Sequence, residues 1–185
     1  MCMSADVTLE RYREYLGLLG RLQLDGQLAG KVDVSGVIQT TMLEAYQQAA
    51  IWEPLDEEAR TAWVRRVFAN NLLDEIRRFR AKSRDVSREH SLEQAMDQSA
   101  SRLNDWVAAN QSSPSRKAMR GEEAVRLATA LGCLTPPQRE AIELHHLKGM
   151  TLAEVGKKMR RDKGAVAALI FRGTKRLRVL LGEDE

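Results

Sequence analysis

The chain has 185 residues, 43% of them hydrophobic and 30% charged, which fits one or two small folded domains and excludes a disordered protein. No apolar run approaches the ~18 residues that cross a bilayer, and the N-terminus lacks a basic region followed by an apolar one, so we expect a cytoplasmic protein without membrane insertion. The net charge of +3 is concentrated in two segments, residues 60–84 with eight Lys/Arg against two Asp/Glu and residues 151–181 with nine against two, and two such patches are typical of contact with one polyanion.

Apolar residues recur at spacings of three and four along the chain, and this periodicity predicts an all-α protein. In the first half we expect helices at residues 9–19, 35–50, 56–82 and 92–109. The third of these is the longest, and its arginines lie opposite its apolar stripe. Together these helices predict a first domain over residues 1–109.

Polar turn formers and Pro114 replace the periodicity at residues 110–116, which we interpret as a flexible linker before a second domain at residues 117–185. A helix is expected there at residues 122–131. Another begins at Thr135-Pro136, where threonine can cap and proline fits the first helical position, and it ends at Gly149. The predicted architecture is therefore two small helical domains joined by a flexible linker.

The last two predicted helices have the spacing of a helix-turn-helix. Thr151 and Glu154 form a capping box for a short helix that ends near Met159, and Asp162 then caps a basic helix that runs to about residue 181. The expected joint core consists of Val155, Met159, Val166 and either Leu169 or Ile170.

On DNA, the second of these helices would lie in the major groove, with its cations near phosphates or base edges. The cations that we assign to this contact are Lys163, Arg172, Lys175 and Arg176. The alternative interpretation is an ordinary helical hairpin with a solvated basic face. Capping, turn and charge together favour DNA binding.

The stretches Leu134–Gly149, Thr151–Val155 and Gly164–Leu177 are similar to region four of the sigma-70 family. The resemblance covers about residues 122–181 and implies recognition of the −35 promoter element. Two features differ from the family pattern. Arg160 stands where the family often has a turn glycine, and residues 167–169 are Ala, Ala and Leu where many members carry Lys, Ser or Arg. Base recognition would then depend more on thymine methyl groups and on neighbouring positions.

The first half carries a second pattern, W-x6-N-x3-D-x2-R-R, formed by Trp63, Asn70, Asp74, Arg77 and Arg78. It resembles the −10-binding helices of region two in extracytoplasmic-function sigma factors, over about residues 7–84. Melted DNA needs a cationic track and polar side chains for unstacked bases. The residues that we assign to −10 binding are Arg65, Arg66, Asn70, Asn71, Arg77 and Arg78, with further cations at 80, 82 and 84. For Trp63 and Asp74 we favour structural roles, in the core and in an ion pair.

In this family the preceding helix carries an acidic cluster that docks on the largest subunit of the polymerase. Here Asp33 remains, while Ser35, Gly36 and Thr40 occupy positions that are usually acidic. Phosphorylation would restore negative charge. We therefore predict docking through Asp33, with Ser35 or Thr40 as a phosphorylation switch. The alternative is that Ser35 only caps this helix and that Thr40 is an ordinary surface residue.

These observations predict a non-enzymatic, bacterial sigma factor whose partners are core RNA polymerase and promoter DNA, with an anti-sigma factor or a Ser/Thr kinase as further candidates. The alternative is a stand-alone helix-turn-helix regulator. A metal hydrolase is disfavoured, because the adjacent His145 and His146 point about 100° apart on a helix. Cys2 and Cys133 lack the spacing of a zinc module or disulfide framework, and no cofactor is expected.

Overall fold

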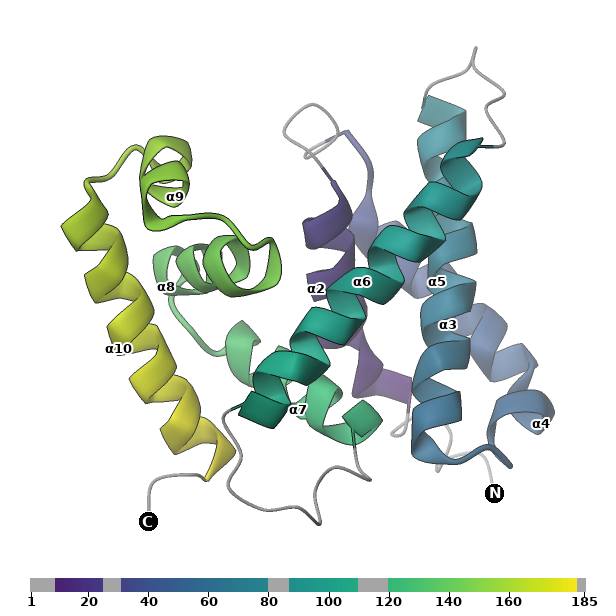
Figure 1. Cartoon of the computed structure of the whole chain (residues 1–185). Coiled ribbons are helices and arrows are strands. Elements are labelled where there is room, and N and C mark those ends of the chain that lie inside the picture. Colours follow the sequence, from purple (N-terminus) through teal and green to yellow (C-terminus); the bar gives the residue numbers. More distant parts are fainter. Residues whose placement is uncertain (1–8, 25–30, 80–86, 110–119, 183–185) are drawn as a thin grey trace.

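The computed structural model describes residues 9–24, 31–79, 87–109 and 120–182, and throughout these ranges its regular structure is helical (Figure 1). The all-α prediction is confirmed. The elements are α2 (Tyr12–Gln23), α3 (Val34–Gln47), α4 (Ala49–Trp52), α5 (Glu57–Phe79), α6 (Ser87–Ala109), α7 (Arg120–Gly132), α8 (Pro136–Ile142), the π-helical turn η2 (Glu143–Leu147), α9 (Leu152–Met159) and α10 (Lys163–Leu181). The predicted linker, residues 110–116, lies outside the described residues.

The second predicted helix is divided in two near Gln48. Asp33 begins α3, because its carboxylate accepts a hydrogen bond from the backbone N–H of Gly36 at 3.0 Å. Ser35 is therefore not the cap. The indole N–H of Trp52 donates to the Ala45 carbonyl at 2.7 Å, and this contact folds α4 back against the end of α3.

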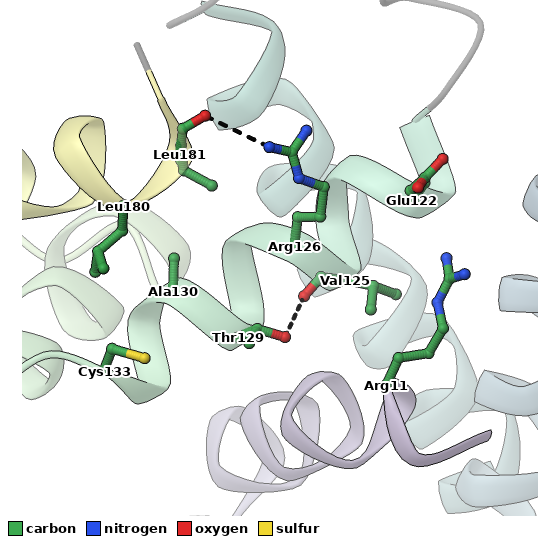
Figure 2. A pocket seen from close by; sticks show the side chains of 9 residues that line it. All are labelled: Arg11, Glu122, Val125, Arg126, Thr129, Ala130, Cys133, Leu180 and Leu181. Atoms are coloured by element: carbon green, nitrogen blue, oxygen red, sulfur yellow. Dashed lines mark hydrogen bonds between the residues drawn. The ribbon is translucent and has the colours of Figure 1, made fainter. Parts of the chain in front are cut away.

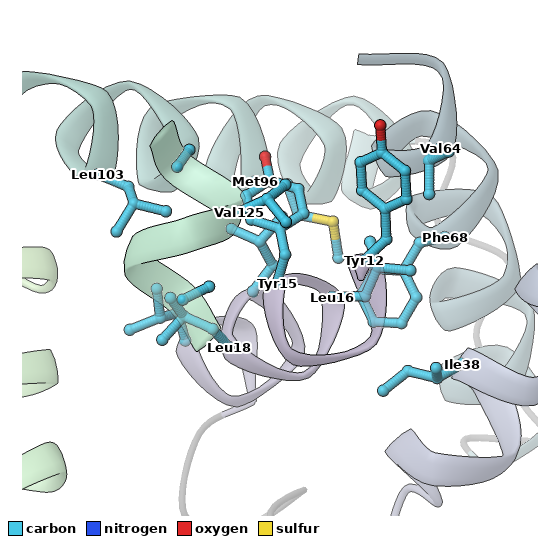
Figure 3. Packing of buried hydrophobic residues seen from close by; sticks show 14 of the residues in the cluster. Tyr12, Tyr15, Leu16, Leu18, Ile38, Val64, Phe68, Met96, Leu103 and Val125 are labelled. Carbon is cyan, nitrogen blue, oxygen red and sulfur yellow. The ribbon is translucent and has the colours of Figure 1, made fainter. Parts of the chain in front are cut away.

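Helix α2 lies at the centre of the larger core and is buried on most of its circumference. Tyr12, Tyr15, Leu16, Leu18 and Leu19 are all at most 1% exposed. Figure 3 shows side chains of α3, α5, α6 and α7 meeting these residues in one cluster. Helices α3, α5, α6 and α7 all pack against α2, which accounts for the burial of these residues.

Helix α7 connects the two halves of the chain. Its buried residues Val125, Ala128 and Leu131 belong to the same core as α2, and it contacts α2, α5 and α6 as well as α10. Gly121 permits this approach, since a Cβ there would lie 2.9 Å from the Thr61 hydroxyl and 3.0 Å from the Glu57 carbonyl. The two halves predicted from sequence therefore pack on a shared core through α7.

A smaller cluster holds the C-terminal helices together. Its buried members are Leu144, Val155 and Val166, with Met159 and Ile170 packed against them. Of the two alternatives expected at this place, Ile170 contributes to the cluster. In the described part of the chain, no helix is both long enough and apolar enough to cross a bilayer.

Candidate nucleic-acid interface

The helix α9 begins at the predicted capping box. The Thr151 backbone N–H donates to Glu154 Oε2 at 2.8 Å, and the Thr151 hydroxyl accepts from the Glu154 backbone N–H at 3.3 Å. The hydrogen bonds from the Thr151 backbone and side chain hold the pKa of Glu154 below its ordinary value. The N-terminus of the helix-turn-helix is therefore fixed by contacts that are local in sequence.

The turn between α9 and α10 depends on Gly156 and Arg160. Arg160 has φ of 54°, in the left-handed region that glycine occupies most easily. The Arg161 N–H donates to the Gly156 carbonyl at 2.9 Å, and a Cβ on Gly156 would lie 2.7 Å from the Arg161 carbonyl oxygen. Asp162 then caps α10 by accepting from the Ala165 N–H at 2.7 Å.

The four cations assigned to −35 recognition are exposed on α10, with Lys163 in its first turn and Arg172, Lys175 and Arg176 further along. Val166, Gly173 and Leu177 are buried and define the inward face. At about 100° per residue, Arg172 and Lys175 lie on the opposite side of the helix. We name these four residues the α10 basic face.

The predicted −10 residues on α5 divide into two groups. Arg66, Asn70 and Arg77 are exposed at spacings of four and seven, opposite the buried Val64, Phe68 and Leu72. Arg77 also pairs with Asp74 at 2.9 Å, which confirms the ion pair predicted for Asp74. Arg78, whose side chain is 79% exposed, pairs with Glu75 at 3.3 Å. We name Arg66, Asn70 and Arg77 the α5 stripe.

Arg65 and Asn71 are directed toward other helices. Arg65 is half-buried, pairs with Asp97 of α6 at 2.9 Å and donates to the Tyr15 hydroxyl at 3.5 Å. Asn71 donates to the Thr41 hydroxyl at 3.2 Å and to Glu44 at 3.3 Å. These contacts give both residues roles in joining α5 to its neighbours.

Trp63 is half-buried and stacks on Trp52, with ring centroids 6.5 Å apart, so its predicted packing role is confirmed. The cations at positions 80, 82 and 84 lie outside the described residues.

The predicted docking residues lie on the exposed side of α3. Ser35 is exposed, and so is Thr40, whose hydroxyl donates to the Gly36 carbonyl at 3.1 Å. A hollow of about 370 Å³ lies between α3 and α5. Its charged lining residues are Asp33, Glu44, Asp74, Glu75 and Arg78.

The same part of the chain exposes three large apolar side chains that sequence reasoning missed. Leu43 and Tyr46 of α3 are 58% and 46% exposed, and Ile51 of α4 is 56% exposed. The sequence pattern did not identify them, because it places Tyr46 on the apolar stripe of the predicted helix and because Ile51 lies beyond the break near Gln48.

A seam between the two halves is formed at the π-helical turn η2. The Arg21 guanidinium of α2 donates to Glu143 Oε1 at 3.0 and 3.3 Å, and Glu143 is nearly buried. Arg102 of α6 donates to the Leu147 carbonyl at 3.1 Å. Both arginines were missing from the predicted site residues.

The two adjacent histidines belong to this seam. His146 stacks on Trp106 of α6, with centroids 4.8 Å apart and planes 8° apart. Burial, and to a smaller extent His145, lowers the pKa of His146. His145 Nδ1 lies 2.7 Å from the Met150 carbonyl oxygen. Within the described residues no group of His, Cys, Asp or Glu side chains could hold a metal ion.

A groove of about 380 Å³ runs between α7 and the end of α10, with Arg11 of the N-terminal segment at one side (Figure 2). Both of its arginines are engaged: Arg11 pairs with Glu57 at 2.6 Å, and Arg126 pairs with Glu123 at 3.0 Å and donates to the Leu181 carbonyl at 3.4 Å. We assign no ligand to this groove.

Two comparisons with known proteins agree with this geometry. Residues 124–177, which span α7 to most of α10, match the family described as sigma-70, region 4. The chain is also 28% identical over 169 residues to the RNA polymerase sigma factor CarQ of Myxococcus xanthus, a match that covers 91% of this chain and 83% of the relative.

The matched region includes the helix-turn-helix whose caps, turn and basic face are described above, and the longer match includes helix α5 with its stripe. This family acts in transcription and is not a class of enzymes. These two matches support a sigma-70 family sigma factor of the extracytoplasmic-function type, with a part in promoter recognition by RNA polymerase.

Proposed function

We propose that this sigma factor reads the −35 element with α9 and α10 and holds the melted −10 element with the α5 stripe. The observation that carries the proposal is the α10 basic face, where Lys163, Arg172, Lys175 and Arg176 are all exposed on the second helix of a well-capped helix-turn-helix. Exposed cations on such a helix can reach phosphates on either side of the major groove.

The proposal has a geometric consequence for the shared core. Elements at −10 and −35 are about 25 base pairs apart, or about 85 Å at 3.4 Å per pair. A compact chain of 185 residues has a radius of gyration of about 16 Å and is about 40 Å across. The two halves therefore have to separate along the seam or α7 when both elements are bound, and core polymerase is the partner that can hold them apart.

The −35 assignment is tested by the salt dependence of promoter binding. Each phosphate contact contributes about 0.9 to the slope of log affinity against log salt, so Arg172→Ala with Arg176→Ala should lower this slope by about 1.8. The matched control is Arg13→Ala with Lys31→Ala, which removes two charges outside α10, at the half-buried Arg13 and the exposed Lys31, and should leave the slope unchanged. An unaltered slope in the α10 variant would exclude these residues from the DNA contact.

The −10 assignment predicts a defect in strand opening. Asn70→Ala with Arg77→Ala should reduce the permanganate reactivity of unpaired −10 thymines while initial duplex binding is retained, because the α5 stripe would engage single strands. The control is Arg13→Ala with Gln98→Ala, which changes a half-buried residue of α2 and an exposed residue of α6. Normal melting in the α5 variant would contradict the assignment.

We propose further that α3 docks on the polymerase, through the acidic hollow and the exposed Leu43 and Tyr46, and that phosphorylation strengthens this contact. Thr40 is the preferred site, since its hydroxyl is exposed and phosphate would add about −1.5 to −2 charges beside the docking surface. Ser35, in the first turn of α3, is the second candidate, because negative charge there is favoured by the helix dipole. A Ser/Thr kinase and an anti-sigma factor stay predicted partners.

The phosphorylation proposal is tested by co-purification with core polymerase. Thr40→Glu and Ser35→Glu should retain more polymerase than the corresponding alanine variants. Thr129→Glu is a matched control, because Thr129 is also exposed and donates to the carbonyl four residues earlier, at 3.0 Å. Equal retention by all variants, with no phosphate detected by mass spectrometry on the protein from its native cell, would remove the switch.

The stand-alone regulator predicted as an alternative differs in one measurable respect. It would bind a specific duplex without polymerase, whereas the proposed function requires core enzyme for promoter-specific binding and opening. Mobility shifts with and without core polymerase separate the two.

A further inference from the structure

Phe171 is the most exposed of the large apolar side chains identified on the surface, at 71%. It lies in the middle of α10, next to Arg172 and four residues before Lys175. Its neighbour Ile170 packs against both apolar clusters, while Phe171 belongs to neither of them. Phe171 therefore contributes little to the fold that the described residues build.

The ring lies on the side of α10 that faces away from the domain. Relative to the buried Val166, a helix turning about 100° per residue places Phe171 near 140° and Lys175 near 180°. A helical side chain leans toward the N-terminus and covers the turn before its own Cα, so the ring of Phe171 is directed over Ala167 and Ala168. These three residues form one apolar surface inside the α10 basic face.

Single exposed apolar residues are common, so exposure alone does not indicate function. The location of this surface does indicate a function, because the surrounding cations would bring it to the edges of base pairs. In the major groove the C5-methyl group of thymine is the apolar feature, and phenylalanine and alanine are side chains that contact it. Ala167, Ala168 and Phe171 also have no side-chain donor or acceptor with which to read other bases.

We propose that Phe171, supported by Ala167 and Ala168, recognises thymine C5-methyl groups in the −35 element, while Arg172 and Lys175 position the helix on the phosphates. This inference rests on the proposed −35 function of α10. It names the chemical feature that α10 selects: a methyl group at C5 of a pyrimidine, on one or two neighbouring base pairs.

The test uses the holoenzyme formed from core polymerase and the full chain. Promoter fragments randomised over the −35 element are first selected for binding. In the selected fragment each −35 thymine is then replaced singly by deoxyuridine, which lacks the methyl group and keeps the same hydrogen-bonding edge. Burying one such carbon corresponds to about a fourfold change in affinity.

With the unmodified protein, deoxyuridine at one or two positions should weaken binding about fourfold, and Phe171→Ala should bind thymine and deoxyuridine equally. Phe171→Leu should keep part of the preference. Val179→Ala is the matched control, since Val179 is a 50% exposed apolar residue of the same helix, and it should keep the full preference. Because Phe171 is outside both clusters, the alanine variant should retain the helical circular dichroism of the parent.

A flat deoxyuridine scan with the unmodified protein would overturn the inference and leave the −35 function intact. So would an undiminished thymine preference in Phe171→Ala. If Phe171→Ala instead lost core polymerase and kept its thymine preference, the ring would belong to a polymerase contact. If no −35 sequence were selected at all, the proposed function of α10 would fail, and this inference with it.

Discussion

The ion pair between Arg21 and Glu143 gives a direct measure of how strongly the two halves are held together. Arg21→Ala would leave the Glu143 carboxylate, whose side chain is 11% exposed, without the guanidinium that now donates to it twice. Removing one member of a fully buried pair costs about 3–5 kcal/mol, and an exposed pair contributes about 0.2–1 kcal/mol. Since the Arg21 side chain is 39% exposed and water can enter beside it, we expect a loss of about 1–2 kcal/mol.

Urea unfolding followed by circular dichroism measures this loss. With a slope of about 2 kcal/mol per molar urea, the midpoint should fall by about 0.5–1 M. Adding Glu143→Gln to the Arg21→Ala variant should recover part of the stability, because a neutral amide is less costly to bury than an unpaired carboxylate. Arg13→Ala, which breaks the exposed pair with Glu10, is the control and should cost at most about 0.5 kcal/mol. Equal losses for the Arg13 and Arg21 variants, or no recovery with glutamine, would refute the reasoning.

Three further variants test the seam and the turn. Because the pKa of His146 is lowered below its ordinary 6.5, the unfolded chain takes up this proton first, so the free energy of unfolding should be full above pH 6.5 and decline below it. His146→Phe, which keeps a ring against Trp106, should remove this part of the decline in urea titrations at several pH values; an unchanged pH profile would contradict it. Gly156→Ala should lower the unfolding free energy by about 1–3 kcal/mol, since its Cβ would lie 2.7 Å from the Arg161 carbonyl oxygen, and a thermal melt identical to that of the parent would argue against this clash. Arg160→Gly should raise the unfolding free energy by about 0.5–1 kcal/mol by relieving the left-handed conformation, and a lower melting temperature would show that the arginine side chain compensates for the strain.

Helix ends that depend on local contacts could be predicted from the sequence. Thr151 with Glu154, and Asp162 before Lys163, hold the N-termini of α9 and α10 at the expected residues, because the capping bonds join groups only three residues apart. The break in the second helix was not predictable in this way, since it depends on the Trp52 indole reaching back seven residues to Ala45.

The residues of the candidate site also differ in whether local sequence or the tertiary fold determines their contacts. The cations of α10 are exposed as expected, because one face of that helix is packed and the other is charged. On α5, by contrast, Arg65 and Asn71 share the predicted DNA-binding pattern and yet contact Asp97 and Thr41, which lie 32 and 30 residues away. A spacing pattern identifies candidate side chains, but the partners of each depend on helices that only the tertiary fold brings near.

Helix α7 also determines where this protein can be cut for the construction of chimeras. A hybrid joined within residues 110–119 would replace α7 by a foreign helix that has to pack against α2, α5 and α6 of this chain. A residue larger than glycine at position 121 of that helix would clash with Thr61 and Glu57 of α5. A junction near Cys133, an exposed residue after the end of α7, keeps the helix with these three neighbours and alters its contact with α10. If α9 and α10 read the −35 element as proposed, promoter specificity is best transplanted from residue 134 onward, although the match to region four begins ten residues earlier, at residue 124.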